Sequence, residues 1–355
     1  MIPQYEPLVD KDYTDAVASQ MSSGWYGPGK VTTLFESMIK DTCYSRHDVT
    51  VRAVPSGTIA LMLAIKALDV PKHFKILFPS YTFLAGANAA RFLGYEVELV
   101  DVNENTLCMD IEALERKLRL SKDPTQYVVI YVTHNGYSGP DGFEIRNICD
   151  NFGISMIEDG CQSLGSPNFS LYGHIATLSF SVPKIVTTGQ GGAVVSCSSL
   201  ANRIDELCDH GGGNWRKTRI HESIGLNARM SDINSALGVA QLSKLPLLLG
   251  MRQGVRVMYQ SCGISILGEH RYSPWMMLHK TTDALGLAEY LWKHNIQAVQ
   301  YYTPISWNVP YALVDPATLP NAEKIYESVL YLPSSLSLTI EQVSEISKHI
   351  LEFNK

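Results

Sequence analysis

The sequence predicts an α/β sandwich that is built on a mostly parallel sheet. Between about residues 50 and 200, short apolar runs alternate with segments of helical pattern, an order that is typical of βαβ units. The run 127–132 consists only of Tyr, Val and Ile, as expected of a strand that is buried on both faces. The chain of 355 residues is long for one core, so we expect a large domain over residues 1–240 and a smaller C-terminal α+β domain over residues 241–355.

The expected elements follow one another in a regular order. The expected strands are residues 76–78, 97–100, 127–132, 154–158 and 193–195. The expected helices are residues 59–65, 84–93, 110–120, 143–152, 201–207, 231–248 and 339–353, with a glycine break at residues 211–213. Asp110 and Thr339 are suitable N-caps, and the Ala/Leu-rich stretch 231–248 is expected to be one helix that bridges the two domains. Because parallel sheets bind ligands beyond the carboxyl ends of their strands, residues just after each apolar run are the candidate site residues.

The composition excludes several classes of function. The net charge is −6 and basic residues are few and scattered, which argues against nucleic-acid binding. The first residues have neither a basic flank nor an apolar core, so we expect no signal peptide, and no apolar run is long enough to cross a bilayer. The seven cysteines contain no CxxC pair, so we expect no metal site and reduced thiols in a cytoplasmic protein.

Lys184 is the first candidate catalytic residue. It stands between an apolar strand and a glycine-dense turn that leads into the strand 193–195. A lysine held there against the protein body loses hydration, which lowers its pKa and favours the neutral amine that attacks an aldehyde. A solvated lysine at a strand end is the plain alternative, so the interpretation depends on the residues around it.

Two upstream features have the chemistry of a phosphate cradle and of a ring platform. Ser56, Gly57 and Thr58 directly precede a convincing helix, and small hydroxyl residues at a helix N-terminus favour a bound phosphate. Phe83 follows the strand 76–78, where an aromatic ring can stack on a flat cofactor. An ordinary N-cap and ordinary core packing are the respective alternatives.

Three polar residues follow the later strands. Asp159 comes directly after a buried strand, where a carboxylate needs a cation such as a protonated pyridine nitrogen; a structural salt bridge is the alternative. Gln162 stands where it can bond a neighbouring phenolic oxygen, and Ser179 can reach a phosphate or bond only to backbone. With Lys184, these residues are the parts of a pyridoxal phosphate (PLP) site.

Five ordered motifs resemble the DegT/DnrJ/EryC1/StrS family, the PLP-dependent nucleotide-sugar aminotransferases, over nearly the whole chain. They are AVPSGT at residues 53–58, PSYTF at 79–83, IEDGCQ at 157–162, the stretch 179–192 and LNARMSD at 226–232. The resemblance implies a fold-type I PLP-transferase, a three-layer sandwich. It implies Lys184 as the residue that bonds the cofactor and moves the proton, and Asp159 at the pyridine nitrogen. It also places Gln162 at the ring oxygen, Phe83 on the ring face, and around the phosphate Ser56, Gly57, Thr58 and Ser179.

The resemblance also implies partners. The asparagine that matches Asn227 reaches the phosphate from the neighbouring subunit, so a homodimer with shared active sites is expected. The expected amino donor is L-glutamate, and the expected acceptor is a nucleotide-linked deoxy sugar with a keto group at C-4 or C-3. His134, Tyr302 and Arg229 are the candidate substrate residues; Arg229 is either a clamp for the donor carboxylate or a surface arginine.

Several positions depart from the family pattern. Gln190 replaces a usual glutamate, and Tyr301 and Ser306 stand where histidines are common. The segment 165–179 and the region after Gly250 are shorter than usual. These departures concern the sugar nucleotide more than the cofactor.

Three other functions are weighed against an aminotransferase. Sugar dehydratases of the family carry histidine in place of Lys184, and a β-eliminating enzyme would need the same lysine and aspartate. A non-catalytic binding or sensor protein would share the fold, but it has no reason to retain Lys184, Asp159 and Gln162 together. The motif around Asn227 favours the sugar enzymes, so the sequence predicts a nucleotide-sugar aminotransferase.

Overall fold

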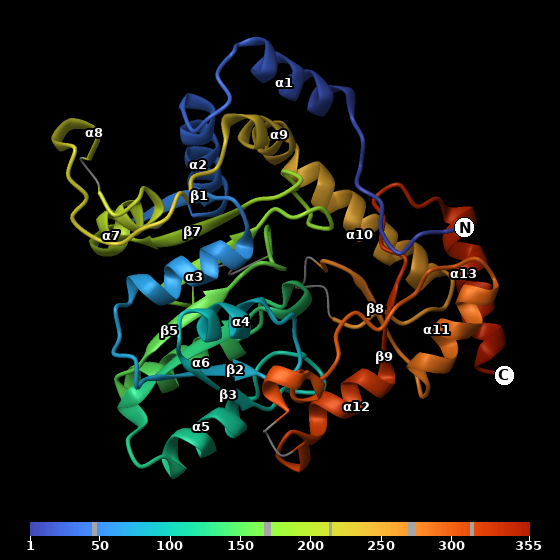
Figure 1. Cartoon of the computed structure of the whole chain (residues 1–355). Coiled ribbons are helices and arrows are strands. Elements are labelled where there is room, and N and C mark those ends of the chain that lie inside the picture. Colours follow the sequence, from blue (N-terminus) through green and yellow to red (C-terminus); the bar gives the residue numbers. More distant parts are fainter. Residues whose placement is uncertain (45–47, 167–171, 213–214, 269–273, 313–315) are drawn as a thin grey trace.

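The computed structural model describes residues 1–44, 48–166, 172–212, 215–268, 274–312 and 316–355 and shows an α/β fold (Figure 1). Its centre is a seven-stranded sheet of order β1-β7-β6-β5-β4-β2-β3. Strand β7 (Gly192–Cys197) runs antiparallel to β1 and β6, and the remaining neighbours in this sheet pair in parallel. The prediction of an α/β fold with a mostly parallel sheet is confirmed.

The elements of the chain have the following bounds. The strands are β1 (Val49–Val54), β2 (Lys75–Pro79), β3 (Glu96–Val100), β4 (Tyr127–Val132), β5 (Ser155–Asp159), β6 (Ile175–Ser179), β7, β8 (Met277–Lys280) and β9 (Val329–Leu332). The helices are α1 (Lys11–Ser22), α2 (Lys30–Cys43), α3 (Gly57–Ala67), α4 (Ala85–Phe92), α5 (Ile111–Leu120), α6 (Asp141–Phe152), α7 (Ser198–Cys208), α8 (Trp215–Thr218), α9 (Asp232–Leu242), α10 (Leu245–Ser261), α11 (Ala284–Lys293), α12 (Pro320–Ser328) and α13 (Ile340–Phe353). Short 3₁₀ turns include η2 (His134–Gly136).

The expected strands are confirmed as β2, β3, β4, β5 and β7, and the apolar strand expected before Lys184 is β6. The elements β1, α1 and α2 have no counterpart among the expected ones. The two proposed N-caps are also confirmed. The side chain of Asp110 accepts from the N–H of Ala113, and Thr339 forms a capping box with Gln342 at the start of α13. Gly213 of the expected glycine break lies outside the described residues.

The prediction of one helix over residues 231–248 is wrong. The segment forms two helices, α9 and α10, with Ser243 and Lys244 between them. Pro246 lies in the first turn of α10, where its missing N–H has no intrahelical acceptor to lose. In a continuous helix, its ring would clash with the carbonyl of Leu242 and leave that carbonyl without its hydrogen bond.

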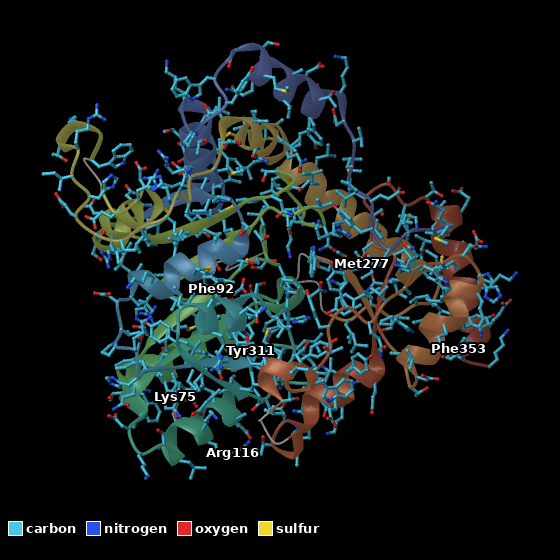
Figure 2. All side chains as sticks on the ribbon, in the orientation of Figure 1. Lys75, Phe92, Arg116, Met277, Tyr311 and Phe353 are labelled. Atoms are coloured by element: carbon cyan, nitrogen blue, oxygen red, sulfur yellow. The ribbon has the colours of Figure 1, made fainter. Side chains whose placement is uncertain are left out.

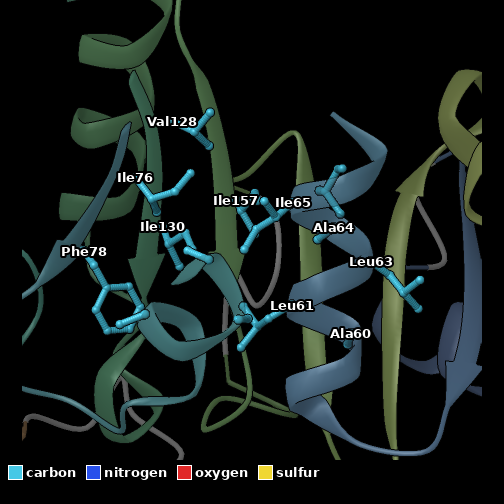
Figure 3. Packing of buried hydrophobic residues seen from close by; sticks show 14 of the residues in the cluster. Ala60, Leu61, Leu63, Ala64, Ile65, Ile76, Phe78, Val128, Ile130 and Ile157 are labelled. Carbon is cyan, nitrogen blue, oxygen red and sulfur yellow. The ribbon is translucent and has the colours of Figure 1, made fainter. Parts of the chain in front are cut away.

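Helices cover both faces of the sheet, and alternate residues of β4 belong to different cores. Val128 and Ile130 belong to the core under α3 and α4, of which Figure 3 shows the α3 side chains facing the strands. Val129 and Tyr131 belong to the core under α5 and α6. The strand is therefore buried on both faces, as its composition predicts.

The two-stranded sheet of β8 and β9 lies apart from the large sheet. With α10, α11 and α13 it forms a core of its own, in which Met277 is buried and Phe353 lies at the edge (Figure 2). The domain boundary at residue 240 stays a prediction. All seven cysteines are free, and within the described ranges no helix is long and apolar enough to span a bilayer.

Candidate active site

A cavity of about 280 Å³ lies beyond the carboxyl ends of β2, β5 and β6 and against the N-terminus of α3. This is the edge of a parallel sheet at which ligands are expected. Nine of the predicted site residues line the cavity: Ser56, Gly57, Thr58, Phe83, Asp159, Gln162, Ser179, Lys184 and Tyr302. The structure does not bring His134, Asn227 and Arg229 to it.

Lys184 lies in the turn that follows β6, where its backbone N–H donates to the carbonyl of Ser181 at 3.0 Å. Its amine lies 3.7 Å from the centre of the Trp275 ring. Burial lowers the pKa of the Lys184 amine to about 8, although the nearby Cys161 and Asp159 oppose the fall. A large fraction of this amine is therefore neutral under mildly alkaline conditions, as a nucleophilic lysine requires.

In the cofactor-free protein, we expect Lys184 to react with acetic anhydride with a midpoint near pH 8. Pulse labelling over a pH series, followed by mass spectrometry of the Lys184 peptide, measures this midpoint. In denaturant the same lysine should return to an ordinary pKa of about 10.4. Equal midpoints in the folded and unfolded protein would show that the fold does not activate the amine.

Asp159 ends β5 and is buried, and its Oδ1 accepts from the N–H of Cys161 at 3.0 Å. Burial raises the pKa of the Asp159 carboxyl, while the bonds from Cys161 and the charge of Lys184 partly oppose the rise. Asp159 forms no salt bridge with any lysine, arginine or histidine in the described ranges. The structural salt bridge considered above is thus not found, and a cationic ligand group would relieve the cost of this buried carboxylate.

The N-terminus of α3 forms one end of the cavity. Ser56 is the N-cap, and its side chain accepts from the N–H of Ile59 at 3.2 Å. A Cβ on Gly57 would lie 2.9 Å from the Cβ of Ser179 and 3.0 Å from the Sγ of Cys161. At this end of the cavity, hydroxyl groups lie close to the free N–H groups of an eleven-residue helix. This arrangement favours the binding of an anion.

Phe83 is 60% exposed although it is a large apolar residue. Its ring lies 6.3 Å from that of Tyr302, and both rings line the cavity. Ordinary core packing does not explain a side chain that is so little covered. An exposed ring at the mouth of a cavity is instead available to stack on a flat ligand.

Gln162 connects the cavity to the turn after β4. Its Oε1 accepts from the N–H of Asn135 at 2.8 Å, which leaves its NH₂ group as the donor for a ligand oxygen. Asn135 has a left-handed φ of 49°, a conformation that asparagine tolerates better than most residues. The left-handed turn at Asn135 thus directs a backbone donor at Gln162 and fixes its orientation.

His134 lies behind the cavity wall instead of in it. Its Nε2 is 2.8 Å from the hydroxyl of Tyr331, and its ring packs on Tyr81 and against the edge of Tyr302. Burial, together with the charge of Lys184, lowers the pKa of His134 to about 3. The imidazole is therefore neutral and supports Tyr302 from behind.

Arg229 and Asn227 belong to a different part of the surface. The guanidinium of Arg229 pairs with Asp209 at 3.1 Å and donates to the Oδ1 of Asn227 at 3.1 and 3.2 Å. Arg229 lines a second, wider groove of about 880 Å³ together with Trp25 and Arg52. Within one copy of the chain, neither residue reaches the cavity that contains Lys184.

Sequence reasoning missed one wall of the cavity. Trp275 and Tyr301 line it from the C-terminal part of the chain, and Cys161 lines it from inside a motif in which it had no assigned role. No local pattern marks Trp275, because the residues that it contacts are remote in the sequence. Tyr301 stands where the family commonly has a histidine, and this difference alone does not predict its place in the cavity wall.

The comparisons with known proteins agree on one family. The model of the DegT/DnrJ/EryC1/StrS aminotransferase family matches residues 7–351. The GDP-perosamine synthase of Vibrio cholerae is 26% identical over 373 residues, with 99% of each chain covered. The dTDP-4-dehydro-2,3,6-trideoxy-D-glucose 4-aminotransferase of Saccharopolyspora spinosa is 27% identical over 384 residues, which cover 100% of this chain and 96% of that protein. Among solved structures, Helicobacter pylori PseC, an aminotransferase of pseudoaminic acid biosynthesis, has a TM-score of 0.88 at 25% identity, with 99% of this chain and 98% of that chain covered.

Proposed function

Because this chain belongs to the DegT/DnrJ/EryC1/StrS family of PLP-dependent nucleotide-sugar aminotransferases, we propose that it moves an amino group from L-glutamate to a nucleotide-linked deoxy sugar. The proposed acceptor is the keto group at C-4 of the sugar, and a keto group at C-3 is the second choice. The printed name of the Saccharopolyspora relative, a 4-aminotransferase of a 4-dehydro sugar, supports C-4. The choice of glutamate follows the usual donor of the family.

One observation carries the proposed site: the amine of Lys184 and the buried carboxylate of Asp159 face the same cavity, beside the N-terminus of α3. PLP has an aldehyde, a pyridine nitrogen and a phosphate, and these three residue groups match them in chemistry. Two features fit the cofactor: the buried Asp159 carboxyl, which has no salt-bridge partner among the described residues, and the close approach of Gly57 to Ser179 and Cys161.

The roles of the residues follow from their chemistry. PLP supplies an aldehyde that captures amines and a ring that takes up the electrons released at the donor's α-carbon. Asp159 would keep a proton on the pyridine nitrogen, and the α3 N-terminus with Ser56, Thr58 and Ser179 would hold the phosphate. The Nζ of Lys184 would bond the aldehyde in the resting enzyme and, once displaced by the donor, would move the proton from the donor's α-carbon to the aldehyde carbon of the cofactor.

Two alternatives receive less support. A sugar dehydratase of this family would carry histidine in place of Lys184. A non-catalytic binding protein would not need an amine whose pKa is lowered to about 8 by burial. No feature of the described residues favours either alternative.

The proposed enzyme is a cytoplasmic homodimer. Asn227 lies outside the cavity of its own chain, so only a second copy can bring it to a phosphate, as the resemblance implies. The neighbouring Ile224 is 90% exposed and Leu226 is 46% exposed, so this segment offers apolar surface that a second copy would cover in the proposed dimer. The free cysteines fit a reducing compartment.

An absorbance experiment tests the proposed function. The purified protein, soaked with PLP, should show a visible band that borohydride traps on Lys184 and that L-glutamate, but not D-glutamate, converts to a near-ultraviolet band. Nucleotide-linked 4-keto and 3-keto sugars should then restore the visible band, and the one that restores it fastest identifies the acceptor. A protein that shows no band after soaking would refute the enzyme and favour the binding-protein alternative.

Replacing Gly57 with alanine should weaken PLP binding by about tenfold. The new Cβ would meet Ser179 and Cys161 at 2.9 and 3.0 Å, and such overpacking costs about 1–3 kcal/mol. A cost of about 1.4 kcal/mol within this range, borne by the phosphate site, corresponds to about tenfold in affinity. Titration with PLP, followed by the visible band, measures the change. Gly254→Ala is the matched control, because a Cβ at that position of α10 meets nothing within 4 Å. Equal affinities of the two variants would show that the Gly57 approach does not shape the phosphate site.

A further inference from the structure

Trp275 touches the turn of Lys184 at two points. Its indole N–H donates to the carbonyl of Pro183 at 2.6 Å, and its ring lies under the Lys184 amine, with 3.7 Å between Nζ and the ring centre. The side chain is 2% exposed, so water does not compete for the ring face. Trp275 thus holds the backbone beside the lysine and its amine at the same time.

The turn after β4 holds Trp275 in this place. The carbonyl of Asn135 accepts from the N–H of Trp275 at 3.3 Å. The side chain of Asn135 accepts from the N–H of Met276 at 2.7 Å and donates to its carbonyl at 3.0 Å. Asn135 is itself bound to Gln162 through its N–H. Moving the indole away from the amine would therefore break several hydrogen bonds between distant parts of the chain.

We propose that the face of Trp275 is the resting place of the Lys184 amine during the part of the reaction in which the lysine is not bonded to the cofactor. The inference rests on the proposed role of Lys184 as the residue that bonds the aldehyde and then leaves it. An aromatic face attracts an ammonium group, most strongly where water is excluded. Trp275 is thus a positioning residue, which keeps the released amine within the cavity.

The effect of the Trp275 ring on the protonation of the Lys184 amine can be separated from the effects of the other groups around that amine. Asp159 and Cys161 face the amine from the end of β5, and the neutral His134 lies behind Tyr302. The carboxylate of Asp159 favours the ammonium form, and so does the indole face, whereas burial disfavours it. Burial also raises the pKa of the Cys161 thiol, which therefore stays neutral. Removing only the ring, while leaving an apolar side chain in its place, should therefore shift the amine further towards its neutral form.

The test compares Trp275→Leu with Trp275→Phe in the cofactor-free protein. The labelling midpoint of Lys184 should be lower by about one pH unit in the leucine variant. It should stay close to the wild-type value in the phenylalanine variant, which retains a ring face but not the N–H bond to Pro183. Trp307→Leu is the control, because Trp307 bonds to Glu323 and contacts Tyr326 instead of Lys184. An unchanged midpoint in Trp275→Leu would overturn the proposal, and so would equal shifts in the leucine and phenylalanine variants.

A second measurement uses the unmodified tryptophan and does not depend on the folding of a Trp275 variant. An ammonium group on an indole face changes the fluorescence of that indole, so the wild type should show a fluorescence transition at the labelling midpoint of Lys184. The transition should be absent in Lys184→Met, and its persistence there would overturn the proposal. Neither measurement needs PLP, so a protein that failed to bind PLP would refute the proposed function without changing either result.

Discussion

Replacing Lys184 with alanine should lower turnover by more than about 10³-fold, because the variant loses both its covalent hold on the cofactor and its proton-transfer group. Single-turnover spectra with L-glutamate measure the loss. The unfolding temperature should be unchanged or higher, because the substitution removes an amine whose burial disfavours its charged form. Loss of activity together with an intact fold would assign the amine to chemistry instead of to structure.

Two control variants sharpen this test. Lys184→Arg retains a positive charge, but a guanidinium does not give up its proton, so this variant should be as inactive as the alanine variant. Lys348→Ala removes a lysine of α13 whose side chain is 70% exposed and should retain full turnover. Turnover in Lys184→Ala comparable to that of Lys348→Ala would show that another group moves the proton.

Replacing Asp159 with asparagine should slow turnover by about 10²–10³-fold, the usual loss when one electrostatic contact to a developing charge is removed. Asparagine has the same shape, and its amide oxygen can still accept from the N–H of Cys161. The variant therefore removes the negative charge and leaves the hydrogen bond. Stopped-flow measurement of the glutamate half-reaction gives the rate, and an unchanged rate would make Asp159 a structural residue.

The same variant should stabilise the protein when PLP is absent. The pKa of the Asp159 carboxyl is raised by burial, so the stability contributed by its protonated form is lost as the pH rises through the folded-state pKa. At pH 8, cofactor-free Asp159→Asn should therefore melt at a higher temperature than the wild type, and the difference should shrink as the pH falls. With PLP bound, the order should reverse, since only aspartate pairs with the ring cation.

Much of the sheet and most of the cavity could be predicted from sequence. A continuous run of Tyr, Val and Ile such as 127–132 predicts a strand that is buried on both faces. In the structure, every residue of this strand, β4, is buried. Asp159 and Ser179 end their strands, so the parallel topology brings them to one edge of the sheet whatever the details of packing. Lys184, in the turn just after β6, follows the same rule.

The rest depends on contacts that no local pattern records. Trp275 is separated by 92 positions from its partner Pro183, and Met276 by 141 positions from Asn135. The break before α10 depends on one proline in a stretch that is otherwise Ala/Leu-rich, which a composition argument overlooks. His134 is a candidate substrate residue by the family resemblance, but its burial behind Tyr302 is decided by β9, through Tyr331.

The hydrogen bonds between Asn135 and Met276 join an early part of the chain to a late one. The cavity is therefore complete only when the later part has been synthesised. The sheet, the lysine turn and the α3 N-terminus are all encoded before residue 200, but the wall that Trp275 provides follows more than seventy residues later. A chain still emerging from the ribosome therefore has the open sheet edge without its closing wall. A ligand that needs the Trp275 wall would therefore bind to, and stabilise, only a chain that has been synthesised past residue 275.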